Sequence, residues 1–133
     1  MTDAEILTLV RQLEQCQLSP ADFHHRDHLA VSAAYLYSGD LETALARVRV
    51  ALLRFIAHHG LQGYHETITR FWLQQVEKRL DLNLCLAKSV ERIQEELGDK
   101  NLVYCYYSKE LLDSPQARER WVEPDLARGD GEQ

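Results

Sequence analysis

The feature that most constrains this chain is its hydrophobic period, which is helical throughout and is interrupted by recurrent start and stop signals. Apolar residues recur three or four positions apart, and no stretch of useful length alternates with period two. Capping residues such as Thr2 and Asp40 precede these stretches, and glycines such as Gly39, Gly60 and Gly98 follow them. The pattern predicts an all-α protein.

The same signals predict an architecture of about five helices, over residues 3–16, 26–38, 41–59, 64–80 and approximately 82–97. Asp81 or Asn83 is expected to cap the fifth. Short helical turns are expected between residues 102 and 117. The segment 121–126 is too apolar for a free tail, so we expect it to pack back on the bundle as a C-terminal strap. The expected organisation is one helical domain over residues 1–127, followed by a flexible tail at 128–133.

Length and charge limit the classes of partner. A chain of 133 residues is typical of a single domain that buries its own core. Its net charge of −6 argues against a nucleic-acid partner, and we interpret the cluster of Arg47, Arg49 and Arg54 as a solvated helix face. No run approaches the roughly 18 apolar residues that span a bilayer. We therefore expect no nucleic-acid partner and no membrane association.

The cysteines indicate a reducing compartment. Cys16, Cys85 and Cys105 are odd in number, widely spaced, and placed within apolar helical patterns. Such cysteines are typical of reduced, buried thiols rather than of a disulfide framework. We therefore expect a cytoplasmic protein.

The six histidines fall into two groups, at residues 24–28 and 58–65. Residues three or four apart share a helix face, so His25 and His28 lie on one stripe with Ser32 and point towards the core. His65 lies one turn before Thr69 on another helix. If these two helices pack side by side and begin at the same end, His25, His28 and His65 converge.

Three neutral imidazoles with an open fourth position form a catalytic type of metal site. Glu66 could be a further ligand or a general base acting on metal-bound water, and Asp27 could be a ligand or an acceptor for a ligand's ring N–H. The sequence therefore predicts a divalent transition metal at His25, His28, His65 and Glu66. Zn, Fe, Ni, Mn and Cu all suit these ligand types.

The same residues also have structural explanations that require no metal. A single histidine at a core edge is more often a packed residue that bonds a carbonyl, and Glu66 in a first turn complements the helix dipole. His58 and His59 suit the negative end of a helix, and His24 is expected to be exposed.

The order of several motifs resembles that of a family of small uncharacterised bacterial all-helical proteins. The resemblance covers residues 19 to 126 and rests on Phe23-x-His25-x-x-His28-Leu29, Tyr64-His65-Glu66-Thr67-Ile68-Thr69 and Trp121-Val122-Glu123-Pro124-Asp125-Leu126. It implies that the site residues are His25, His28, His65 and Glu66, and not His24, His58 or His59. It also implies that the C-terminal segment belongs to the domain, and it implies no particular reaction or substrate.

Three classes of function stay open at this point. The first is a metal-dependent enzyme, hydrolytic or oxidative, that acts on a small-molecule substrate with Glu66 as a catalytic group. The second is a non-catalytic module that binds a small ligand or a metal. The third is a structural or interaction protein without metal, in which an apolar helix face forms a homodimer.

Overall fold

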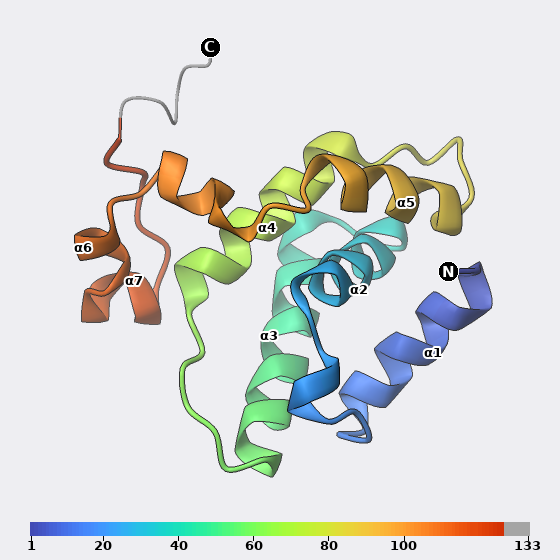
Figure 1. Ribbon diagram of the computed structural model, residues 1–133, viewed down its shortest axis with the longest axis horizontal. Coiled ribbons are helices and arrows are strands. Elements are labelled where there is room, and N and C mark those ends of the chain that lie inside the picture. Colours follow the sequence, from blue (N-terminus) through green and yellow to red (C-terminus); the bar gives the residue numbers. More distant parts are fainter. Residues whose placement is uncertain (127–133) are drawn as a thin grey trace.

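The computed structural model describes residues 1–126 as helices packed on one another, with no strand in that part of the chain (Figure 1). The elements are α1 (Asp3–Glu14), η1 (Pro20–Asp22), α2 (His25–Tyr37), α3 (Leu41–His58), α4 (Glu66–Arg79), α5 (Leu86–Glu96), η2 (Lys100–Cys105), α6 (Lys109–Leu112) and α7 (Pro115–Glu119). The predicted all-α bundle is confirmed. Residue 127 and the predicted tail at 128–133 lie outside the described residues. Through residue 126, no helix has the combination of length and apolarity needed to cross a membrane.

The central element of the bundle is α2, which contacts α1, α3, α4 and α5 (Figure 1). Leu29, Ala30 and Ala33 of this helix have no exposed surface. A helix that is apolar on most of its circumference must be covered on most sides. The other long helices surround α2 for this reason. At its start Asp27 is buried and His25 and His28 are partly buried, whereas Arg26 is exposed.

Local capping fixes several helix starts where the sequence predicts them. The Thr2 hydroxyl accepts a hydrogen bond from the Glu5 N–H (3.1 Å), and the Glu5 carboxylate accepts one from the Thr2 N–H (2.8 Å). The Asp40 carboxylate accepts a hydrogen bond from the Thr43 N–H at 2.8 Å. Each pair satisfies backbone donors that the first turn leaves free.

Two helix starts differ from the prediction. α4 begins at Glu66 rather than Tyr64, because the ring of His65 is its N-cap. α5 begins at Leu86 with Cys85 as its N-cap. The carboxylate of Asp81 instead accepts a hydrogen bond from the Asn83 N–H (2.9 Å) within a turn that precedes the helix.

The C-terminal strap packs back on the bundle, as the sequence predicts. Phe71 of α4 and Tyr107 are buried in a second apolar cluster that also includes Trp121 and Val122. The Tyr107 hydroxyl donates a hydrogen bond to the Val122 carbonyl at 2.6 Å. The strap therefore covers one side of α4 and fixes the surroundings of that helix's first turn.

The expectation that the three cysteines are buried was wrong. All are free, but Cys85 and Cys105 are exposed and Cys16 is partly exposed. Cys16 follows α1 with a φ of 58°, and Cys85 and Cys105 stand at the ends of helical elements. Residues at the ends of helices lie closer to solvent than the apolar pattern around them indicates.

Candidate functional site

His25 is held at the start of α2 by a contact to a distant helix end. Its ring Nε2 lies 2.9 Å from the carbonyl oxygen of Leu97, and its ring meets Trp72 edge-on at a centroid distance of 4.5 Å. A carbonyl oxygen only accepts, so Nε2 donates this hydrogen bond. His25 is therefore oriented by the structure, and within residues 1–126 no hydrogen bond involves its Nδ1.

His28, one turn further along α2, has surroundings unlike those of the other core-side histidines. No hydrogen bond within residues 1–126 involves its ring, whereas the rings of His25 and His65 each bond a backbone carbonyl. Phe23 packs on it at a centroid distance of 4.2 Å. Burial chiefly, and nearby His25 in addition, lower the pKa of His28 to about 4, although Asp27 opposes the shift. The imidazole is therefore neutral near pH 7.

His65 is engaged at both ring nitrogens. Its Nδ1 accepts a hydrogen bond from the Ile68 N–H at 3.2 Å and so caps α4, while its Nε2 lies 2.7 Å from the Leu112 carbonyl oxygen. Burial lowers the pKa of His65, and the hydrogen bond to Leu112 acts in the opposite direction. In this arrangement the ring has no lone pair left for a metal ion.

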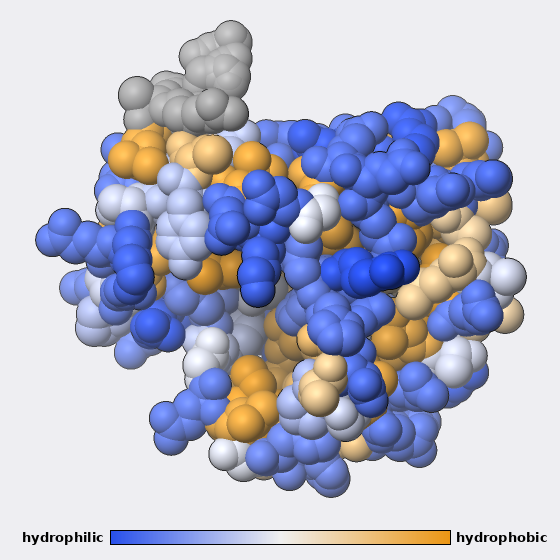
Figure 2. All heavy atoms as spheres, viewed as in Figure 1, coloured by the Kyte–Doolittle hydropathy of each residue, from blue (hydrophilic) through white to orange (hydrophobic). Residues whose placement is uncertain are grey.

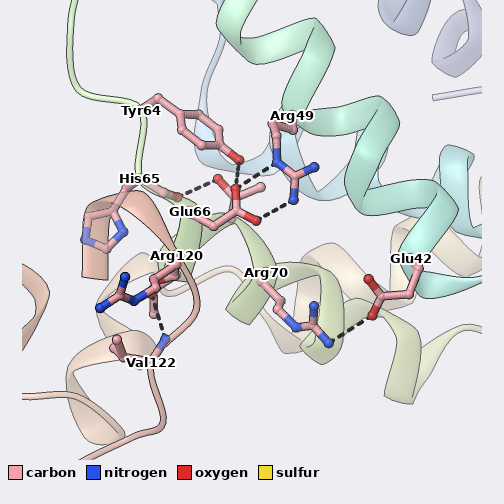
Figure 3. Close-up of polar contacts among 10 residues, drawn as sticks. Glu42, Arg49, Tyr64, His65, Glu66, Arg70, Arg120 and Val122 are labelled. Carbon is pink, nitrogen blue, oxygen red and sulfur yellow. Dashed lines mark hydrogen bonds and ion pairs between the residues drawn. The ribbon is translucent and has the colours of Figure 1, made fainter. Parts of the chain in front are cut away.

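Glu66 faces a different direction from His65 (Figure 3). Its carboxylate accepts two hydrogen bonds from the Arg49 guanidinium, at 3.0 and 2.5 Å, and one from the Tyr64 hydroxyl at 2.6 Å. The bonds from Arg49 hold the pKa of Glu66 below its usual value, although burial opposes them. Glu66 is therefore an ionised partner in a salt bridge between α3 and α4.

The remaining polar residues of the 64–69 motif also make structural contacts. The Thr67 hydroxyl donates to the Arg120 carbonyl at 2.8 Å and accepts from the Val122 N–H at 3.2 Å. The Thr69 hydroxyl donates to the His65 carbonyl at 2.8 Å. The contacts of Thr67 join the first turn of α4 to the strap, and the pair of Glu66 with Arg49 joins it to α3 (Figure 3). The motif thus serves as a junction between three parts of the chain.

The four predicted metal ligands do not share a centre in the described structure. Across residues 1–126, no three His, Cys, Asp or Glu side chains are placed to hold one metal ion. His25 and His28 do line one cavity. Asp27 accepts a hydrogen bond from the His24 N–H at 3.0 Å, as one half of a capping box. Metal binding stays a prediction, and the partners of His65 and Glu66 do not support a role for these two as ligands.

Helices α2, α3 and α4 bring polar and aromatic side chains together around a cavity beside His28. It has a volume of about 320 Å³ and is lined by Phe23, His25, His28, Ser32, Val48, Ile68, Thr69 and Trp72. On the face drawn in Figure 2 the surface is hollowed between α3 and the start of α4, with hydrophobic atoms in the floor. The fold and this cavity define a class: a small helical bundle with an internal pocket at the start of its central helix.

The sequence reasoning named two residues of this region without assigning either of them to the site. Ser32 lies four positions after His28 on the stripe already identified, so its spacing alone could have placed it in the site. Arg49 was interpreted as part of a solvated face, yet its guanidinium reaches the Glu66 carboxylate. No sequence signal identifies that pair, because the partners are 17 residues apart on different helices.

The contacts of Glu66 predict that it stabilises the fold. Glu66→Gln keeps the shape but removes the charge that the Arg49 guanidinium meets, so we expect a loss of about 1–2 kcal/mol in the free energy of unfolding. The loss stays moderate because the Arg49 side chain is 39% exposed and can turn to water. The matched control is Glu42→Gln, whose pair with Arg70 involves a carboxylate that is 70% exposed. It should change stability by less than about 0.5 kcal/mol in urea titrations. Equal effects of the two variants would contradict the structural role of Glu66.

Comparisons of the chain with models of known protein families, with curated proteins and with solved structures found no match. The resemblance to a bacterial family noted from the motifs therefore stays an expectation. The residues that carried it are nevertheless placed by the structure, in the cavity (His25, His28) and in the junction that supports it (His65, Glu66).

Proposed function

We propose that this protein binds a small molecule in the cavity beside His28, and that His28 is the polar group that recognises it. The observation that carries the proposal is the neutral imidazole of His28, which lines the cavity and has no hydrogen-bond partner within residues 1–126. The ring is partly buried and borders an apolar cavity, where a polar group without a protein partner can gain a hydrogen bond from a bound molecule. A ligand that hydrogen-bonds to the ring therefore gains affinity.

Binding is better supported than catalysis. A neutral imidazole inside a cavity can accept or donate one hydrogen bond and could also take a proton from a bound molecule. The carboxylate predicted to assist such a step, Glu66, is engaged with Arg49 and Tyr64. We therefore propose a ligand-binding protein. An enzymatic reaction in which His28 acts as the general base would extend this proposal at the same site.

A divalent transition metal is the second candidate for this cavity. The observation that favours it is the contact of His25 with the Leu97 carbonyl, because metal-binding histidines commonly donate their other ring N–H to such an oxygen. His25 and His28 would then supply two imidazoles, and the bound small molecule or water would supply the remaining ligands. Zn, Fe, Ni, Mn and Cu remain compatible with such donors.

The proposal is tested by screening untagged protein against a fragment set of neutral, anionic and cationic molecules, with ligand-observed NMR as the measurement. We expect a group of fragments to bind wild type and to lose binding in His28→Leu. The matched control is His58→Leu, which makes the same change at an exposed histidine outside the cavity and should retain binding. Fragments that bind both variants equally, or an absence of binding to wild type, would overturn the proposal.

Elemental analysis of the same protein decides the metal candidate. Near-stoichiometric metal in wild type that disappears in both His25→Ala and His28→Ala supports ligation by this pair. Equal metal content in wild type and both variants removes metal from the proposal, and fragment binding is then assigned to the cavity alone.

A further inference from the structure

A second chamber lies next to the cavity beside His28 and shares part of its lining. The second chamber has a volume of about 280 Å³, and its walls come from α3 and from the loop before α4, through residues such as Leu52, Phe55 and Gly63. Both chambers are lined by Phe23, His28, Ile68 and Thr69. Because they share these four residues, the chambers adjoin at His28. A single elongated molecule could therefore pass the imidazole and occupy both.

The lining of both chambers lacks ionisable groups other than histidine and tyrosine. No Lys, Arg, Asp or Glu is among the lining residues that the structure describes for either chamber. Of the carboxylates around the chambers, that of Asp27 accepts a hydrogen bond from the His24 N–H, and that of Glu66 is directed to Arg49 and Tyr64. An ion that entered would lose its hydration and would meet no opposite charge among the described lining residues, so its binding is disfavoured. The lining therefore favours an uncharged, largely apolar molecule.

Two polar groups in the first chamber are free to bind such a molecule. Ser32 lies one helical turn after His28 on the same face of α2, and only 6% of its surface is exposed. Neither the Ser32 hydroxyl nor the His28 ring has a hydrogen bond within residues 1–126, although their neighbours Thr69 and His25 bond carbonyl oxygens at 2.8 and 2.9 Å. A ligand hydroxyl, which both donates and accepts, could satisfy the two groups together.

We infer that the ligand is an uncharged amphiphilic alcohol or phenol that spans both chambers and places its hydroxyl between His28 and Ser32. This inference rests on the proposed function, because it specifies the molecule that the cavity binds. The hydroxyl donates to one of the two side chains and accepts from the other, and the apolar part of the molecule lies along Phe23, Ile68 and Trp72 in the first chamber and along Leu52 and Phe55 in the second.

Isothermal titration calorimetry with 4-alkylphenols and the matching 4-alkylbenzoates, from methyl to octyl, tests the class and the length of the ligand. Phenol affinity should rise about fourfold with each added methylene until both chambers are filled, and should then level off. Each benzoate should bind at least about tenfold more weakly than the phenol of the same length, because the described lining offers its carboxylate no Lys or Arg. Benzoates that bind as tightly as phenols would overturn the inferred class.

Ser32→Ala separates a binding role from a structural one. We expect the variant to weaken phenol binding about five- to tenfold, since one hydrogen bond to the ligand is lost. Its midpoint of urea unfolding should stay equal to that of wild type or rise, because the deleted hydroxyl has no hydrogen-bond partner within residues 1–126. The matched control, Ser38→Ala, makes the same change at an exposed serine and should retain full affinity. A lowered midpoint together with unchanged affinity would assign Ser32 to the fold and overturn its role.

Filling one chamber at a time tests whether the ligand spans both. Val48→Phe adds bulk to the first chamber and Leu52→Phe to the second. Each variant should weaken the long-chain phenols at least about tenfold, while the methyl and ethyl phenols should be affected only by Val48→Phe. If only one variant affects the long phenols, the spanning arrangement is wrong.

The outcomes also distinguish this inference from the proposed function. Anionic or cationic fragments that depend on His28 while the phenols do not bind would overturn the ligand class and leave the binding site in place. Failure of both the fragments and the phenols to bind would overturn both.

Discussion

Lowering the pH from 7 to 4 should reduce the free energy of unfolding of the metal-free protein by roughly 3 kcal/mol through His28 alone. The cause is the difference between the pKa of this ring in the folded protein, about 4, and the ordinary value of 6.5 that we assign to the unfolded chain. Each pH unit of difference corresponds to about 1.4 kcal/mol.

The sign follows from which state binds the proton more readily. Below pH 6.5 the unfolded chain protonates His28 while the folded protein keeps it neutral, so protonation stabilises the unfolded state. Stability is therefore fully present above pH 6.5, falls as the pH decreases from 6.5 towards 4, and stops falling from this cause below 4. His65, whose pKa is also lowered by burial, contributes a change of the same sign.

The measurement is a series of urea unfolding curves between pH 4 and 8, in the presence of a chelator, for wild type and His28→Leu. Subtracting the two series cancels the contributions of carboxylates such as Glu66, whose lowered pKa removes stability at more acidic pH. The difference should be flat above pH 6.5 and should change by roughly 3 kcal/mol between pH 6.5 and 4. His58→Leu should reproduce the wild-type curve. A flat difference over the whole range would show that His28 is not kept neutral by burial.

Phe71→Ala should cost about 3–5 kcal/mol of stability. The Phe71 side chain is only 2% exposed, and its ring meets Trp72 and Tyr106 edge-on at centroid distances of 5.1 Å and Tyr107 at 6.2 Å. Removal of the ring leaves a cavity at the centre of the apolar cluster that holds the strap against α4. The loss should therefore appear first in residues 103–126.

Urea unfolding gives the size of this effect, and hydrogen exchange gives its location. Amide protection should fall in the strap before it falls in α2, because α2 belongs to the other apolar cluster. The control is Tyr104→Ala, which removes an aromatic ring that is 47% exposed in the same segment and should change stability by less than about 0.5 kcal/mol. Uniform loss of protection in Phe71→Ala would mean that the strap and the bundle unfold as one cooperative unit.

Much of the fold could be predicted because its determinants are local. The capping contacts of Thr2 and Asp40 join residues three positions apart, and the hydrophobic period requires only neighbouring turns. The errors also have a local cause. Histidine is not among the usual capping residues, so the helix that His65 caps was placed two residues too early.

The candidate site was predictable in part. The spacing of His25, His28 and Ser32 places them on one face of α2, and the structure finds all three lining one cavity. The roles of His65 and Glu66 were not predictable, because they depend on partners from other elements. Glu66 meets Arg49 of α3, and His65 meets the Leu112 carbonyl, which is 47 residues away.

By itself, the sequence determined that this chain is helical, where most helices begin and end, and which histidines face inward. Period and capping act within a few residues, so tertiary contacts were not needed to decide them. Only the tertiary structure decided which inward histidine makes no hydrogen bond within residues 1–126. The carbonyl that occupies His25 is 72 residues away in the chain, and only the packing of α5 against α2 brings it within hydrogen-bonding distance.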